Sequence, residues 1–294
     1  MKKILFLFIC FSLLVLVGCA GFPHRTIIGT GEVIEKTYEL KEATKLEVKD
    51  FHIQKGTAME PVTLRLHPSE EQKVVIQANE SLFSRFTCKI SFKTLKIHGV
   101  RNDAYDCEGI SIDVYGYVFE DIDISFADTI VDAACLSDNK LKLNCSGASK
   151  INITNDYQAT QIRIDCSGAS SVNLLKCNFD SIRADLSGAS SLEIEQLVAE
   201  EAKMNCSGAS NAAILNGGTI KQLNLDCSGA SNVLLSKVTS LNVKVDLSGA
   251  SSATIAFTGS VDGSISGASN LKYIGDSSKI NVKQSGGASL IRIS

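Results

Sequence analysis

The sequence predicts an all-β protein: a single-stranded parallel β-helix, or β-solenoid, of about nine regular turns of about 20 residues, preceded by a β-rich N-terminal region. The first observation behind this prediction is a repeat. The tetrapeptide Ser-Gly-Ala-Ser occurs seven times, with starts 18 to 21 residues apart, at Ser146, Ser167, Ser187, Ser207, Ser228, Ser248 and Ser266. A fixed period of this length indicates a solenoid, in which each turn, here called a rung, buries its apolar side only by stacking on the next.

The second observation is the alternation of apolar and polar residues on both sides of each tetrapeptide. Ile162, Ile164 and Cys166 precede one copy at every second position, and Val172 and Leu174 follow it in the same way. Period two is the signature of a β-strand, and about 20 residues are too few for a βαβ unit, which needs roughly 30. Each rung is therefore expected to contain a strand, a corner, a second strand and a variable connection. We expect glycine to supply the left-handed corner and the following alanine to point into the bend.

The chain begins with a predicted secretory signal peptide, residues 1–18, with Lys2 and Lys3 before an apolar stretch. Its end, Leu16-Val17-Gly18-Cys19, resembles the lipobox of bacterial lipoproteins, in which the cysteine receives lipid chains such as palmitate. The resemblance implies that Cys19 is lipidated and that residues 19–28 form a linker from the membrane; the alternative is simple secretion with cleavage nearby. Because alanine rather than aspartate follows Cys19, we expect an outer-membrane location, with the periplasmic or surface-exposed orientation left open.

Residues 29–120 lack the repeat but keep strand-like runs, so we expect a β-rich region that caps the first rung. The runs cover residues 29–33, 45–48, 62–66, 73–77, 89–92, 95–98 and 110–114, and residues 79–83 look like a turn or short helical piece. An imperfect copy of the rung pattern begins near residue 121, so the regular β-helix is expected to span residues 121–294. The chain stops inside a strand, which predicts either end-to-end association of two copies or protection of that edge by the N-terminal region.

A family resemblance rests on the order of these segments. Gly-Thr-Gly-Glu-Val at 29–33, then residues 43–48, then 74–82, then 95–97 and finally the Ser-Gly-Ala-Ser rungs resemble the family described as putative auto-transporter adhesin, head GIN domain. Its members are secreted or lipid-anchored β-helical proteins common in Bacteroidetes. The resemblance covers most of residues 29–294 and implies a cell-envelope protein with an adhesin-like role.

Two outward-facing columns are the candidate ligand or cation face. Basic residues lie four positions before most of the tetrapeptides, and acidic or amide residues lie two positions before six of the seven. One interpretation is a solvated face whose charges neutralise each other; the other is a platform for a glycan or a divalent cation. The candidate residues are Arg163, Arg183, Asp165, Asp185, Asp226 and Asp246.

We expect a non-enzymatic cell-envelope lipoprotein that acts as an adhesin-like scaffold binding a glycan or another envelope component. The alternative is a carbohydrate-active enzyme, a polysaccharide lyase or hydrolase, because such enzymes use paired carboxylates. Against it, the aspartates recur as a repeat position rather than clustering once in a groove. The four histidines lie outside the rungs, so neither a histidine metal site nor a Ser-His-Asp triad is expected, and no cofactor is implied. A net charge of −3 does not favour a nucleic acid as partner.

The cysteines divide into three groups. Cys10 belongs to the signal peptide and Cys19 to the anchor, while Cys88 and Cys107 are the disulfide candidate outside the stack. Four others occupy one column on adjacent rungs, where parallel Cβ directions disfavour a disulfide, so we expect buried, reduced thiols at Cys145, Cys166, Cys206 and Cys227. Cys135 and Cys177 are left unassigned.

Overall fold

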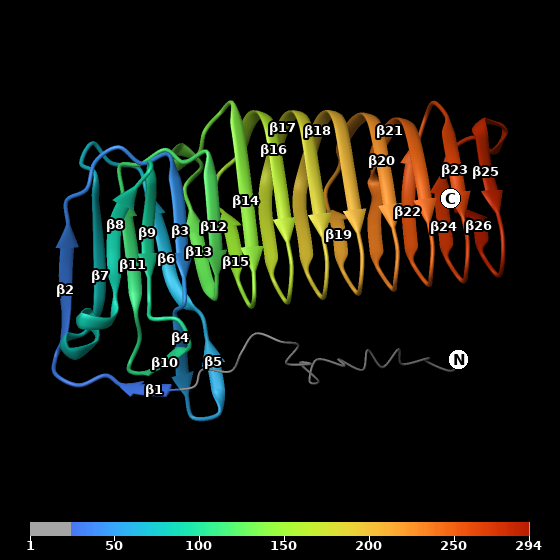
Figure 1. The fold of residues 1–294 in the computed structure, drawn as a ribbon. Helices are drawn as coiled ribbons and strands as arrows, with labels where there is room; N and C mark the ends of the chain where they lie inside the picture. The colour runs from blue at the N-terminus through green and yellow to red at the C-terminus, as the bar shows by residue number, and fades with distance from the viewer. Residues whose placement is uncertain (1–24, 294) are drawn as a thin grey trace, which may run out of the picture.

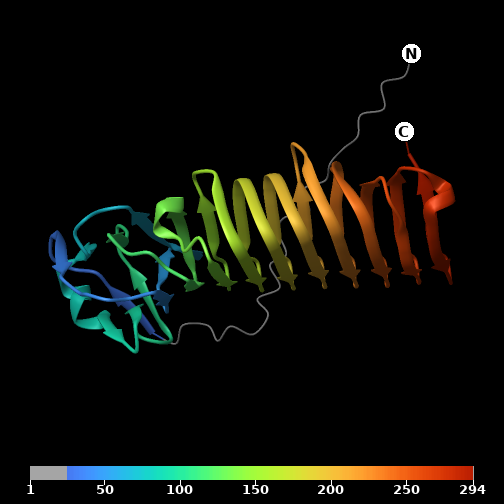
Figure 2. The ribbon, with the colours of Figure 1, turned by 90° about the horizontal axis from the view of Figure 1, so that it is seen from above.

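The computed structural model describes residues 25–293, which form a parallel β-solenoid of about nine rungs with the N-terminal region at one end (Figures 1 and 2). The all-β prediction is confirmed. The predicted signal peptide and Cys19 lie outside the described residues. Among residues 25–293, no helix has the length and apolar character needed to cross a membrane.

Two faces of the solenoid are built as the repeat predicts, one from the strand before each corner and one from the strand after it. We call the face built from the strands before the corners the charged face, because it carries the basic and acidic columns. The face built from the strands after the corners is the second face. The charged face contains β12 (Asp121–Ser125), β14 (Lys140–Ser146), β16 (Tyr157–Cys166), β17 (Ser171–Leu186), β18 (Ser191–Cys206), β20 (Gly218–Cys227), β21 (Asn232–Leu247), β23 (Val261–Ile265) and β25 (Ile280–Gln284). The second face contains β13 (Ala127–Val131), β15 (Lys150–Ile153), β19 (Asn211–Ile214), β22 (Ser252–Phe257), β24 (Asn270–Ile274), β26 (Ser289–Arg292) and the first halves of β17, β18 and β21.

The expected variable connection is instead a third face in the central rungs, which corrects the sequence interpretation. Strands β17, β18 and β21 run for 16 residues without a break, so the connection is part of the strand. Its residues pair from rung to rung, as when Cys177 and Phe179 lie beside Leu197 and Ala199. These four side chains point inward and are buried, so the connection contributes to the core.

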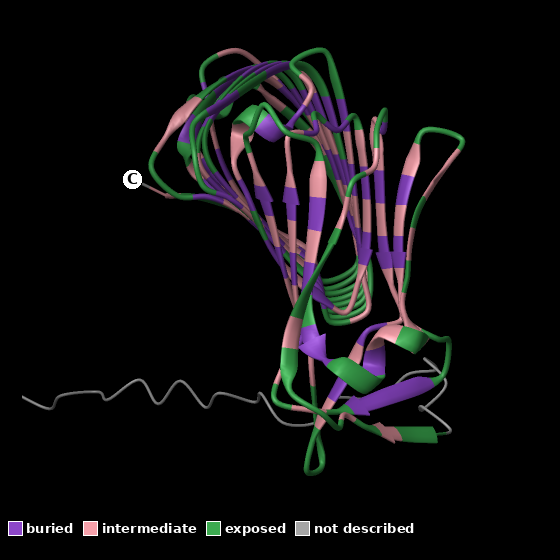
Figure 3. Cartoon of the chain, turned by 90° about the vertical axis from the view of Figure 1, so that its left-hand side faces the viewer, coloured by how far each residue is buried: buried purple, intermediate pink, exposed green. Residues whose placement is uncertain are grey.

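The inward residues of the rungs form one continuous core (Figure 3). Cys166 pairs with Leu186, and Leu186 with Cys206, and each of the three is 2% exposed. Buried and part-exposed residues alternate along the strands of every face, as period two requires. The register predicted from the repeat is thereby confirmed.

The corners differ from the sequence interpretation in one respect. The glycine of each complete tetrapeptide has φ near +70°, as expected, for example 71° at Gly188. The alanine, however, is exposed, and the second serine is the residue that points into the bend. Ser170 is 1% exposed, and its Oγ donates to the carbonyl oxygens of Cys145 and Ser167, both at 2.9 Å. A methyl group cannot make these bonds, so serine takes the inward position.

The N-terminal region continues both faces. On the charged face, β12 pairs with β3 (Lys45–Lys49), β3 with β9 (Thr94–His98), and β9 with β8 (Thr87–Ser91). On the second face, the order outward from β13 is β6 (Val62–His67), β11 (Ser111–Tyr115), β7 (Lys73–Asn79) and β2 (Val33–Tyr38). The outermost pairs on both faces are antiparallel, so this end of the stack is closed by hairpin-like pairing rather than by another rung.

A small separate sheet lies beneath the N-terminal region in Figure 1. Its order is β1 (Arg25–Ile28), β10 (Asp103–Asp106), β4 (His52–Lys55) and β5 (Ala58–Glu60). Residues 25–28, expected as linker, are therefore a strand, and residues 29–32, expected to open a strand, lie between β1 and β2. Three short 3-10 helices complete the fold: η1 (Glu80–Arg85), near the expected helical piece, η2 (Ala133–Cys135) and η3 (Ser277–Lys279).

Candidate ligand-binding face

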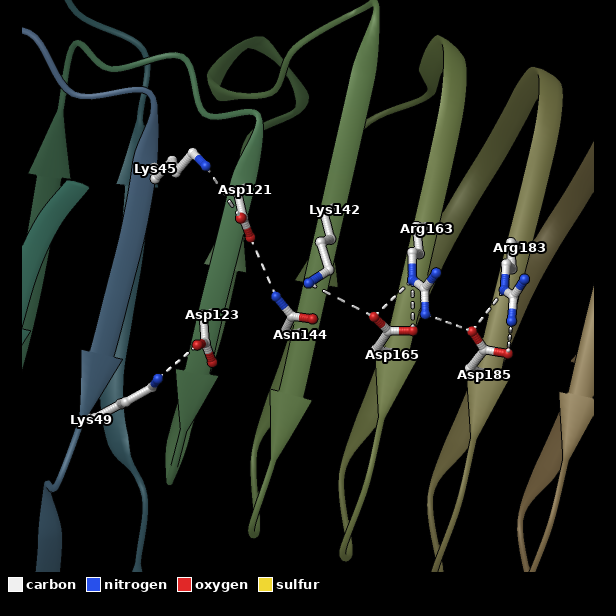
Figure 4. A network of polar contacts seen from close by, with 10 residues as sticks. All are labelled: Lys45, Lys49, Asp121, Asp123, Lys142, Asn144, Arg163, Asp165, Arg183 and Asp185. Carbon is white, nitrogen blue, oxygen red and sulfur yellow. Dashed lines mark hydrogen bonds and ion pairs between the residues drawn. The ribbon is translucent and has the colours of Figure 1, made fainter. Parts of the chain in front are cut away.

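The charged face brings the predicted basic and acidic columns together as one network (Figure 4). Lys142, Arg163 and Arg183 lie in register on β14, β16 and β17, and Asp165 and Asp185 lie two residues further along their strands. Outward side chains two residues apart share one face of a strand, and strands lie about 4.8 Å apart. Each aspartate is therefore within reach of two rungs.

The two arginines hold the two aspartates across adjacent rungs. Arg163 Nε lies 3.0 and 2.9 Å from the two carboxylate oxygens of Asp165, and its Nη2 donates to Asp185 Oδ2 at 3.0 Å. Arg183 donates to Asp185 through Nε at 2.8 Å and Nη2 at 3.1 Å. Asn205 Nδ2 on the next rung also donates to Asp185. Lys142 Nζ lies 3.9 Å from Asp165.

These contacts keep Asp185 ionised. Burial alone would raise its pKa, but hydrogen bonds from Arg183 and Asn205 and the charge of Arg163 outweigh burial, so the pKa of Asp185 is lowered from its ordinary 3.8. The hydrogen bonds to Asp165 and Asp185 raise the pKa of Arg163 and Arg183 respectively. The part of the face that holds the two arginines and Asp185 therefore carries charges of both signs near neutral pH.

The other two candidate aspartates have different surroundings. Asp226 and Asp246 are in register on β20 and β21, and neither has an ion-pair partner among residues 25–293. Ser264 Oγ donates to Asp246 at 2.9 Å. Asp185 and Asp226 line a shallow hollow of about 330 Å³ beside the corners. In the described part of the chain, no three His, Cys, Asp or Glu side chains are grouped so that they could hold a metal ion.

A second hollow, of about 510 Å³, lies on the same face where the N-terminal region meets the first rungs. We call it the basic hollow, because its charged lining is Lys45, Lys140, Lys142, Arg163 and Arg183 with only Glu120 and Asp121 opposite in sign. Sequence reasoning missed Lys45 and Asp121. Their sequence signal was the alternation of Lys45, Glu47 and Lys49. This segment forms β3, which pairs in register with β12 although it carries no Ser-Gly-Ala-Ser corner.

Within residues 25–293, the cysteines carry free thiols. The predicted disulfide between Cys88 and Cys107 is not formed: both thiols are free, and Cys107 Sγ contacts the carbonyl oxygen of Tyr105 at 3.8 Å. Burial raises the pKa of Cys88 to about 12. The four rung cysteines are buried, as expected. A hydrogen bond with Cys166 and burial raise the pKa of the Cys145 thiol, which disfavours the reactive thiolate.

A family assignment follows from the comparison with known proteins. The family model described as "Putative auto-transporter adhesin, head GIN domain" matches residues 55–216 and 209–277. The chain belongs to this family. Among curated proteins, none matches this chain.

Solved structures of low sequence identity share the fold. A protein described as a putative adhesin from Parabacteroides merdae is 14% identical, with a TM-score of 0.63 over 92% of this chain and 99% of that chain. A protein described as a putative lipid binding protein from Parabacteroides distasonis is 12% identical, with a TM-score of 0.66 over 92% of this chain and 100% of that chain. A putative adhesin from Parabacteroides distasonis is 14% identical, with a TM-score of 0.63 over 91% and 100%. The family points to an adhesin-like role in the cell envelope.

Proposed function

We propose that this protein is a lipid-anchored, non-enzymatic scaffold of the cell envelope that presents its charged face to a glycan or another envelope component. The observation that carries the proposal is the Arg163–Asp165–Arg183–Asp185 network, which fixes polar groups at regular spacing on a rigid sheet. Side chains that are already held in place lose little freedom when a ligand binds. A flat, repeating surface of this kind suits an extended ligand.

Catalysis by the same carboxylates fits the geometry less well. A general acid in glycoside cleavage needs a raised pKa so that it holds a proton near neutral pH, whereas the pKa of Asp185 is lowered. Two arginines occupy its oxygens, so it is also a poor base or nucleophile. Binding rather than turnover is the function that these contacts support.

A glycan array probed with the full chain, purified in detergent, tests the binding proposal. The double variant Asp165→Asn/Asp185→Asn should lose array signal, because the arginines lose the carboxylates that orient them. Asp180→Asn/Glu200→Gln, on the third face, is the matched control and should keep it. Release of reducing ends or unsaturated sugars from a bound glycan, abolished by the first variant, would replace the binding proposal with the carbohydrate-active enzyme.

The anchor at Cys19 is the second part of the proposal, supported by the lipobox-like sequence that precedes it. The wild-type chain should incorporate labelled palmitate in cells and fractionate with the outer membrane. The variant Cys19→Ala should do neither. Label retained in Cys19→Ala would contradict the anchor. End-to-end association of two copies through β25 and β26 stays a prediction.

A further inference from the structure

The basic hollow carries an excess of positive charge on a protein whose net charge is −3. Five basic and two acidic side chains line it, so its lining has a charge of +3, and the charge is +1 when Asp165 and Asp185, which pair with the two arginines, are counted as well. Asp165 and Asp185 hold the arginines from one side and are not part of the lining. A positive hollow on a negative protein attracts anions selectively.

The basic groups of the hollow keep hydrogen-bond donors that their partners within the chain do not occupy. Lys142 and Lys45 only approach carboxylates, Lys142 at 3.9 Å from Asp165 and Lys45 at 4.0 Å from Asp121. Lys140 has no ion-pair partner within residues 25–293. Arg163 and Arg183 bind their aspartates through Nε and Nη2, and the remaining amino group of each guanidinium points away from the carboxylates in Figure 4. Both guanidinium groups are therefore oriented and still able to donate.

The basic groups form a line along the solenoid axis. Lys142, Arg163, Arg183 and Lys203 occupy one register position on four consecutive strands, about 4.8 Å apart. A single phosphate would reach one or two of them. A linear polymer with regularly spaced anions would reach all four, because the sheet beneath is flat and continuous.

The face also lacks what a neutral sugar would need. The outward side chains around the line are Lys, Arg, Asp, Asn, Gln, Ser and Glu. No outward side chain of β14, of β16 or of β17 from residue 181 onward is aromatic, because Tyr157, on β16, is buried. Neutral sugars are gripped mainly by packing their apolar ring faces on aromatic side chains. Recognition here must rest on charge and hydrogen bonds.

We propose that the basic hollow and the line from Lys142 to Lys203 bind an acidic polysaccharide through its carboxylate or sulfate groups, with the polymer running along the solenoid axis. This inference rests on the proposed binding function and names its ligand class. The free amino group of each arginine donates to the anions, and the lysines contribute charge. Affinity falls with added salt, because the contacts lie at the surface.

The test measures binding of the full chain, in detergent, to polygalacturonate, dextran sulfate and uncharged dextran by calorimetry at low and high salt. The two acidic polymers should bind and dextran should not. Arg163→Gln/Arg183→Gln should weaken binding about tenfold, the loss expected from two partly exposed charge contacts. Lys140→Gln/Lys142→Gln should act in the same direction, and it leaves the contacts between the arginines and the aspartates intact. Arg183→Lys keeps the charge and should retain most of the affinity for the acidic polymers.

The matched control is Lys176→Gln/Lys237→Gln, which removes two exposed lysines away from the charged face and should leave binding unchanged. Equal losses in the control and the hollow variants would show non-specific attraction and overturn the inference. Binding to phosphatidylglycerol vesicles but not to the polymers, weakened by the same substitutions, would also overturn the inference. Array ligands that bind while both acidic polymers fail would overturn this inference alone; failure of all ligands would also overturn the proposed function.

Discussion

The second serine of each corner is buried because its hydroxyl completes the hydrogen bonding of the bend. Ser170 and its neighbour Ser171 are a natural matched pair, since Ser170 points inward and Ser171 outward. Ser170→Ala should lower the free energy of unfolding by about 1–2 kcal/mol, because the carbonyl oxygens of Cys145 and Ser167 lose a buried donor. Ser171→Ala should be nearly neutral. Urea unfolding measures both, and equal losses would contradict the assigned direction of the two serines.

The corner glycine is required for two reasons that can be separated by substitution. At Gly208, φ is +71° and an added Cβ would lie 2.7 Å from the carbonyl oxygen of Gly188 on the preceding rung. At Gly56, in the turn between β4 and β5, φ is +62° but an added Cβ would meet nothing within 4 Å.

Gly56→Ala should therefore cost roughly 1 kcal/mol, the strain of a left-handed alanine, and Gly208→Ala roughly 3 kcal/mol or more, because the clash with backbone adds to the strain. Thermal unfolding followed by circular dichroism gives both values. If the two variants lost equal stability, close stacking of the corners would not limit residue choice.

The same residues explain which parts of the corner could be predicted. The glycine could be predicted from the sequence because the left-handed φ of the corner favours glycine over other residues. Alanine and serine are both small, so size alone did not tell which of Ala169 and Ser170 points inward. The deciding factor is a bond to a carbonyl oxygen on the preceding rung, and rung-to-rung contacts are absent from a linear pattern.

At the scale of elements, the strands beside the corners were predictable and the third face was not. The columns of Val172 and Leu174 hold apolar residues after every complete Ser-Gly-Ala-Ser corner, but the third-face positions hold Cys177, then Leu197, then Gly218. Only the stacking of rungs shows that these unlike residues share one column. Likewise Lys45 joins the charged network through pairing of β3 with β12, between segments 76 positions apart in the chain.

The N-terminal region should respond to mild acid, whereas the rungs should not. Burial lowers the pKa of His52 and His98 below the ordinary 6.5, and the nearby carboxylates of Glu47 and Asp50 oppose burial without cancelling it. Below pH 6.5 the unfolded chain therefore takes up protons that the folded region resists. The stability that these histidines contribute is complete above pH 6.5 and is lost as pH falls through their lowered pKa values.

Hydrogen exchange, corrected for the intrinsic pH dependence of amide exchange, measures this effect segment by segment. Protection in β3, β4 and β9 should fall on mild acidification, while the rungs after residue 120, which contain no histidine, keep theirs. His52→Gln/His98→Gln should flatten the response of the N-terminal region. A response of equal size in the rungs would assign the acid sensitivity to other groups.

At the scale of the whole molecule, each rung contacts only its neighbours, so the effect of a cavity depends on where along the stack it lies. Leu225 on β20 is 2% exposed with rungs on both sides, whereas Leu290 on β26 is only partly buried at the last described rung. Leu225→Ala should lower the free energy of unfolding by roughly 3 kcal/mol, and Leu290→Ala by less than roughly 1 kcal/mol.

The two variants should also differ in how far the damage extends. An interrupted central rung weakens the coupling between the two halves of the stack, so Leu225→Ala should broaden the urea transition and raise exchange in β18 and β21 on either side. Leu290→Ala should raise exchange only in β24 to β26 and leave the main transition midpoint in place. If both substitutions shifted the main transition equally, the solenoid would unfold as one cooperative block. The charged face would then be kept rigid by the whole stack, and not only by the rungs next to each strand.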